Sequence, residues 1–199
     1  MVQHQRVVEH EDGDLRMTTY QKGDEFLWIE QEDGPESPRK WDNLGTMVTW
    51  HRRYSLGDKQ PEVAPEELRA RLPAGTVMLP LYLFDHGALH IRTSPFSCSF
   101  DSGQIGYIYA TPERLDACGV AIDDVANVLQ REVEVYQMYL EGAVYEYTMY
   151  TKKLCATCGA VHRKTGDSCG GFYGDDHKES GLLESAGITD LTEWKEING

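Results

Sequence analysis

Three cysteines and one histidine near the end of the chain have a spacing that suits a transition-metal site. They form the pattern Cys155-x2-Cys158-x3-His162-x6-Cys169. Two cysteines separated by two residues can present both thiolates to one ion from a tight turn, and two further ligands then complete the tetrahedron that zinc prefers. The sequence therefore predicts a structural zinc site with Cys155, Cys158, His162 and Cys169 as its ligands. The alternative interpretation is a hairpin extension that carries reduced thiols.

A zinc site of this kind would not by itself make the protein an enzyme, because four protein ligands leave no open position for a substrate. Other residues that could do chemistry are scattered. A triad of Ser102, His86 and Asp85, or a pair of Cys98 and His51, can be drawn on paper, but nothing in their spacing selects them. The chain has no G-x-S-x-G nucleophile motif and no phosphate-binding loop with its lysine. We therefore assign no catalytic and no cofactor-binding residue.

The charge of the chain limits the classes of partner that we expect it to bind. Its 199 residues include 33 acidic and 19 basic side chains, which gives a formal net charge of −14. This balance disfavours a general nucleic-acid binder, because phosphate contacts need clustered lysine and arginine. Two interpretations stay open: a solvated acidic surface, or an acidic face that meets a basic partner, including mimicry of DNA by carboxylates.

The location of the protein is inferred from what the sequence lacks. No apolar run approaches the roughly 20 residues that cross a bilayer. The first residues also lack the apolar stretch of a signal peptide. We expect a cytoplasmic protein, in the producing cell or in a bacterial host.

The elements that would position the metal ligands are mostly strands, identified by β-prone runs between turn signals. A strand with proline inside it, over 77–84, should be an edge or bulged strand. The expected strands cover residues 15–20, 25–30, the end of 41–51, 77–84, 89–93, 104–110, 143–152 and 170–174, the last pairing across the cysteine-bearing loop. The expected helices cover residues 65–72, 111–119, about 124–140, and two short C-terminal segments, 177–187 and 190–197.

The order of these elements predicts an α+β fold with a mainly antiparallel sheet, because strands and helices do not alternate as in βαβ units. The long helix over about 124–140 should pack on the sheet with its apolar stripe. The residues of that stripe are Val125, Val128, Leu129, Val133, Tyr136 and Leu140. We expect one domain over 1–199, with polar strands and a loop over 1–40 and a cysteine-containing hairpin extension over 153–169.

Three segments carry a resemblance to a known family. They are Trp41–Val48 (WDNLGTMV), Pro95–Tyr109 (PFSCSFDSGQIGYIY) and Asp167–Asp175 (DSCGGFYGD). Over roughly residues 41–187 the chain resembles a family of bacteriophage, prophage and mobile-element proteins that has no established activity. The resemblance implies an early or accessory phage protein that acts inside a bacterial host.

These observations together lead us to expect a non-enzymatic accessory protein that binds and modulates a host protein, such as a nucleic-acid-binding one. Its acidic surface would suit a counter-defence inhibitor of the anti-CRISPR or anti-restriction type, without direct contact to nucleic acid or membrane. Two alternatives remain. One is a small enzyme for a nucleotide or phosphorylated metabolite, with a pocket between loops 85–87 and 97–103. The other is a zinc-stabilised structural or scaffold protein.

Overall fold

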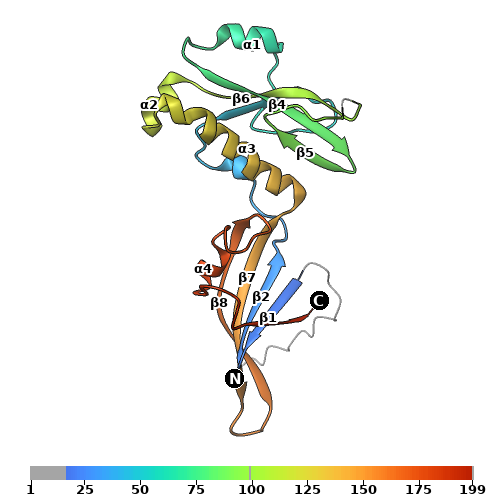
Figure 1. The fold of residues 1–199 in the computed structure, drawn as a ribbon, viewed down its shortest axis with the longest axis vertical. Coiled ribbons are helices and arrows are strands. Elements are labelled where there is room, and N and C mark those ends of the chain that lie inside the picture. Colours follow the sequence, from blue (N-terminus) through green and yellow to red (C-terminus); the bar gives the residue numbers. More distant parts are fainter. Residues whose placement is uncertain (1–16, 99, 199) are drawn as a thin grey trace, which may run out of the picture. The chain divides into compact units, whose positions relative to one another are not determined.

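The computed structural model describes residues 17–98 and 100–198. They form two compact units: a central unit, Gly34–Ala143, and a terminal unit built from the segments on either side of it. The expected α+β class with antiparallel strands is confirmed, but the strands form two sheets where we expected one (Figure 1). No helix in the described part of the chain is both long enough and apolar enough to span a membrane.

The terminal unit contains a five-stranded sheet in the order β8-β7-β2-β1-β9, in which all neighbours are antiparallel. On one face, Leu27, Ile29 and Tyr147 form a core with residues of the C-terminal segment. The strands are β1 (Met17–Lys22), β2 (Glu25–Gln31), β7 (Val144–Leu154), β8 (Val161–Tyr173) and β9 (Lys195–Asn198).

The C-terminal segment differs from the expectation of two short helices. One helix forms, α4 (Leu182–Ser185), and its Leu182 and Leu183 are buried. The segment predicted as a second helix, 190–197, instead turns and continues as β9, which pairs with β1. The free edge of β1 offers this short segment backbone hydrogen bonds, whereas an isolated helix of its length would be only marginally stable.

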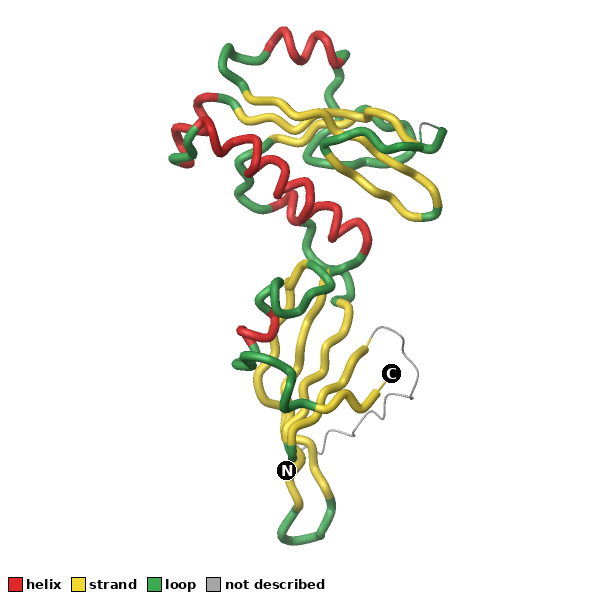
Figure 2. Tube along the Cα trace, in the orientation of Figure 1, coloured by secondary structure: helices red, strands yellow, loops and turns green. Residues whose placement is uncertain are grey.

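The central unit contains a four-stranded antiparallel sheet in the order β3-β6-β4-β5. Its strands are β3 (Thr46–Thr49), β4 (Val77–His86), β5 (Ala88–Arg92) and β6 (Ser102–Ala110). Its helices are η1 (Pro38–Lys40), α1 (Pro65–Arg71), α2 (Pro112–Cys118), η2 (Ile122–Asp124) and α3 (Val125–Glu141), drawn in red in Figure 2. In α3, the buried residues Val125, Leu129, Val133 and Tyr136 belong to the same core as sheet residues such as Leu81 and Ile108.

Because of its proline, we expected β4 to be an edge or bulged strand. The structure fits this expectation only around Pro80. β4 lies between β6 and β5, so it is not an edge strand over its whole length. However, β5 pairs with β4 only from Tyr82 onwards, and the register with β6 shifts between Leu81 and Tyr82. Pro80 therefore precedes both the bulge and the second partner strand, where a missing N–H donor costs little.

Two glycines of the motif segments are required by close packing. A Cβ atom on Gly106 of β6 would lie 2.0 Å from the backbone oxygen of Val48 in β3. A Cβ atom on Gly45 would lie 2.5 Å from Cδ2 of Leu129 in α3. The motif segments thus contain glycine where a larger residue would not fit. Gly106 lets two strands pack closely, and Gly45 lets its loop pack on the helix.

A buried arginine fastens the same loop to α3. The Arg39 guanidinium donates to both carboxylate oxygens of Asp58 at 2.8 Å, to Glu132 at 3.0 Å and to the backbone oxygen of Gly45 at 2.7 Å. Glu132 in turn accepts from the backbone N–H of Leu44 at 2.7 Å. Burial opposes the charge, but the hydrogen bonds and negative charges of Asp58 and Glu132 outweigh it and raise the pKa of Arg39.

Candidate metal centre

The cysteine-bearing segment is the end of a long hairpin formed by β7 and β8. The two strands pair from Val144 opposite Tyr173 to Leu154 opposite Val161, so the expected pairing across the cysteine loop is confirmed. β8 lies at the edge of the sheet, and the pairing of β2 with β7 ends at Thr151. Figure 1 shows the hairpin continuing past the other strands of the terminal unit to its turn.

The turn itself is closed by backbone hydrogen bonds. The N–H of Cys155 donates to the oxygen of Ala160 at 2.8 Å, and the N–H of Gly159 donates to the oxygen of Cys155 at 2.9 Å. Gly159 has a φ of +69°, in the left-handed region that favours glycine. This turn places the sulfur atoms of Cys155 and Cys158 on the same side of the hairpin end, as the two-residue spacing predicts.

Three donor atoms of the predicted site come together. The Sγ atoms of Cys155 and Cys158 and a ring nitrogen of His162 all lie within 4.8 Å of one another. Cys158 Sγ is 3.9 Å from His162 Nε2. A tetrahedral zinc ion with ordinary bond lengths needs its sulfur and nitrogen ligands about 3.6 Å apart. A small side-chain adjustment would therefore bring these three donors to a single ion.

The local backbone prepares Cys155 for metal binding. Backbone N–H groups of Cys158 and Thr157 donate to its sulfur, and together with the side chains of Cys158 and His162 they lower the pKa of Cys155 to about 6. A lowered pKa favours the thiolate, which is the form that binds metals. Cys155 is half-buried, while Cys158 and His162 are exposed, so an ion could reach the three donors from solvent.

The structure does not bring the predicted fourth ligand to this group. Cys169 pairs with Tyr147 in the body of the sheet. It is seven residues from His162 along an extended strand, a separation of about 23 Å. The described residues therefore supply three donors at the end of the hairpin. A fourth position would be filled by water or by a donor from another molecule.

Next to the three donors lies an exposed apolar pair. Leu154 and Val161 face each other across the last rung of the hairpin, and their exposed fractions are 72% and 59%. In a soluble protein, exposed large apolar side chains next to a distinctive site often mark a surface of contact with another molecule.

The triad drawn from the sequence is not assembled. The Ser102 hydroxyl donates to the backbone oxygen of Cys98, and no contact of Ser102 with His86 is observed. The carboxylate of Asp85 forms an ion pair with the exposed Arg53. Each side chain is thus engaged with a partner unrelated to nucleophilic catalysis.

The two candidate histidines, His86 and His51, also have other partners. His86 Nδ1 lies 3.3 Å from the carboxylate of Asp101. His51 Nδ1 accepts from the backbone N–H of Tyr54 at 3.2 Å, and the two rings are stacked with centroids 5.0 Å apart. His51 therefore acts as a structural hydrogen-bonding group in the loop after β3.

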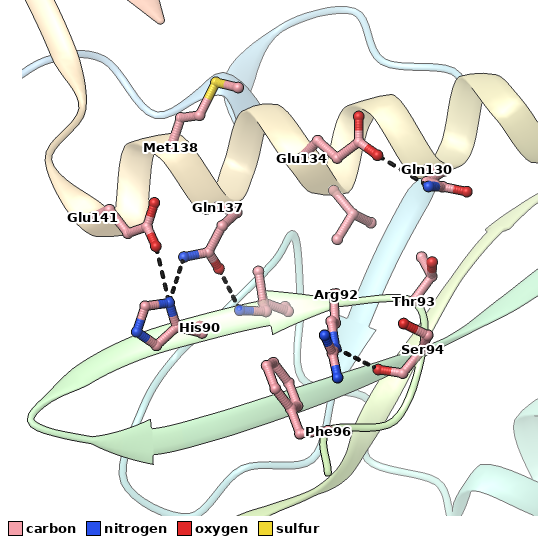
Figure 3. Close-up of a pocket in the computed structure, with 12 residues that line it drawn as sticks. His90, Arg92, Thr93, Ser94, Phe96, Gln130, Glu134, Gln137, Met138 and Glu141 are labelled. Carbon is pink, nitrogen blue, oxygen red and sulfur yellow. Dashed lines mark hydrogen bonds and ion pairs between the residues drawn. The ribbon is translucent and has the colours of Figure 1, made fainter. Parts of the chain in front are cut away.

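The central unit also has a cavity of about 450 Å³ that the sequence did not indicate (Figure 3). It lies between β5 and α3, and none of the residues of the drawn triad lines it. At one end, His90 Nδ1 is 2.9 Å from Glu141 of α3, and at the other the Arg92 guanidinium lies 3.9 Å from the centroid of the Phe96 ring.

The polar centre of this cavity has a structural role. The Gln137 side chain donates to the backbone oxygen of Leu89 at 3.3 Å and accepts from the backbone N–H of Ile91. These are the groups that a neighbouring strand would bind, so Gln137 occupies the open edge of β5. The available signal in the sequence was two polar residues, Gln137 and Glu141, one helical turn apart beside the apolar stripe.

Comparison of the chain with protein-family models, with curated proteins and with solved structures found no match. The fold and the site therefore define the class of protein on their own. It is an α+β protein with two antiparallel sheets, whose edge hairpin ends in a three-donor group that could hold a metal ion.

Proposed function

We propose that this protein is a non-enzymatic accessory protein that docks on another macromolecule through a hairpin ordered by a structural zinc ion. The observation that carries the proposal is the convergence of Cys155, Cys158 and His162, whose donor atoms lie within 4.8 Å of one another at an exposed hairpin end. Two thiolates and one imidazole are a donor set that suits zinc in a reducing compartment.

The surroundings of the hairpin support a structural role for the ion. Residues 161–171 of β8 are all exposed, so this part of the strand has almost no apolar core to hold it. Metal binding can supply the stability that a small segment cannot obtain by burial. The ion would fix the turn, and with it the position of Leu154 and Val161.

The setting of the function comes from the family resemblance and the charge. A phage or mobile-element protein acts on macromolecules of the bacterial host, which supports a host partner whose activity the protein modulates. The chain has more acidic than basic residues, which supports the counter-defence interpretation. Carboxylates can occupy the surface of a host protein that normally binds nucleic acid.

Cobalt titration of the reduced full-length protein tests the metal site, because thiolate-bound cobalt absorbs visible light in a way that depends on its geometry. We expect one equivalent to bind and zinc to displace it. Cys155→Ser and Cys158→Ser should abolish the absorption. The matched controls Cys118→Ser and Cys169→Ser should retain it. Absence of binding by the wild-type protein, or equal loss in the controls, would contradict the proposal.

Affinity capture from host lysate at near-physiological salt tests docking. The zinc-loaded protein should retain a specific partner, and replacing both Leu154 and Val161 with serine should release it, since these exposed side chains contribute little to the fold. If the double variant captures the same partner equally well, the hairpin is not the docking surface.

A further inference from the structure

The hairpin of β7 and β8 is basic at its end, although the chain as a whole is acidic. Residues 147–166 contain none of the 33 acidic residues but four basic ones, Lys152, Lys153, Arg163 and Lys164. All four are exposed, and each lies within three positions of Cys155 or His162. The part of the molecule that projects from the terminal sheet thus has the opposite sign to the chain as a whole.

The positive charge lies on both faces of the hairpin. Lys152 is opposite Arg163, while Lys153 is opposite His162 and Lys164 opposite Thr151. Because successive residues of a strand point to opposite faces, Lys152 and Arg163 share one face and Lys153 and Lys164 share the other. A ribbon of this kind can contact anionic groups on two sides at once.

On one face of the hairpin, two of the basic side chains lie over aromatic rings. The Arg163 guanidinium lies 5.1 Å from the ring of Trp28 and 5.3 Å from that of Tyr150. The Lys152 ammonium lies 4.4 Å from the ring of Phe26. Both Phe26 and Tyr150 are buried. Single-stranded nucleic acids are bound by stacking of bases on exposed rings, which these are not.

We propose that this metal-ordered hairpin binds duplex DNA by entering the major groove, with its basic side chains on phosphates of both strands. The groove, about 12 Å wide, admits a two-stranded β-ribbon. Charges on both faces suit a groove whose two walls carry phosphates. Exposed lysine also favours phosphates over a protein partner, because lysine is depleted in protein–protein interfaces.

The inference rests on the proposed function, since it uses the zinc-ordered hairpin as the docking element. It assigns that hairpin to DNA and leaves the acidic surface of the chain to a host protein. It also explains how an acidic chain can contact DNA. The binding surface is confined to the hairpin, and the acidic remainder limits non-specific contact elsewhere. Four phosphate contacts would make the affinity depend steeply on salt, with a logarithmic slope of about −3.6.

Fluorescence anisotropy of the zinc-loaded full-length protein with a labelled DNA duplex tests the inference. Between 50 and 200 mM salt, affinity should fall about 150-fold for four contacts. The double variant Lys153→Gln with Lys164→Gln should bind more weakly and lose only about 12-fold over the same range, because two contacts remain. The matched control, Lys178→Gln with Lys195→Gln, removes equal charge from outside the hairpin and should behave as the wild type.

The metal content of each preparation separates the two proposals. Zinc bound stoichiometrically without DNA binding would overturn the DNA inference and leave the metal site standing. Absence of zinc from the wild-type protein would overturn the proposed function first. Equal binding of polyglutamate, tighter binding of single strands, or an equal effect of the two double variants would also overturn the DNA inference.

Discussion

The buried arginine of the central unit permits a quantitative test of how the motif loop is held. The perturbation is Arg39→Met, which keeps most of the apolar stem and removes the guanidinium. Arg39 has a side-chain exposure of only 4%, and its four hydrogen bonds reach Asp58, Glu132 and the oxygen of Gly45. Breaking a buried ion pair by removing one partner costs about 3–5 kcal/mol.

The structure places the expected cost near the lower end of that range. Asp58 has a side-chain exposure of 24%, so water can solvate its carboxylate again once the arginine is gone. Glu132 is less exposed, at 12%, but it keeps the backbone N–H groups of Leu44 and Gly45 as donors. We therefore expect the free energy of unfolding to fall by about 3 kcal/mol.

Urea denaturation monitored by tryptophan fluorescence measures this change, since Trp41 and Trp50 both lie in the central unit. With m values of about 1–3 kcal/mol/M, the midpoint should fall by about 1–3 M. The control is Lys40→Met, which makes the same change of charge at the adjacent exposed position. A loss below about 1 kcal/mol for Arg39→Met, or an equal loss for the control, would refute the reasoning.

Three further outcomes are expected. Gly106→Ala should cost about 3 kcal/mol because its Cβ would overlap the backbone oxygen of Val48, whereas Gly103→Ala in the same strand meets no atom within 4 Å and should be nearly neutral in denaturation experiments. Burial lowers the pKa of His177, so the unfolded chain binds this proton more readily than the folded chain does. The free energy of unfolding should therefore fall as the pH drops below about 6.5, and it should fall less in His177→Asn. Urea midpoints at pH 7.5 and 5.5 measure this difference. Identical pH dependence in both proteins would contradict this. Removal of zinc by a chelator should accelerate hydrogen exchange of residues 155–162 while exchange in the core of the central unit stays unchanged, and uniform acceleration would argue against a local structural ion.

The starts and ends of helices could be predicted from residues close to them in the sequence. Thr111 and Pro112 predicted the start of α2, and the Thr111 hydroxyl indeed accepts from the N–H of Arg114 at 3.4 Å. Gly142 predicted the end of α3, and it adopts a left-handed φ of +76°. Such signals act over a few residues, so the sequence shows them directly.

Three of the four predicted metal ligands were recognisable for the same reason. Cys155, Cys158 and His162 lie within eight consecutive residues, and a tight turn suffices to bring their donor atoms together. Cys169 depended instead on the path of the chain after the turn. Because β8 continues as an extended strand, every further residue carries that thiol away from the other three.

The number of sheets and the partners of each strand were decided only by the tertiary structure. Alternating side chains identify a strand but not its neighbour, and β2 pairs with β7 across more than a hundred residues of intervening chain. The same holds for the burial of Arg39 against α3 and for Gln137 on the edge of β5. Short-range preferences are encoded within a few residues, whereas these contacts depend on which distant surfaces bury each other with the least loss of hydrogen bonds.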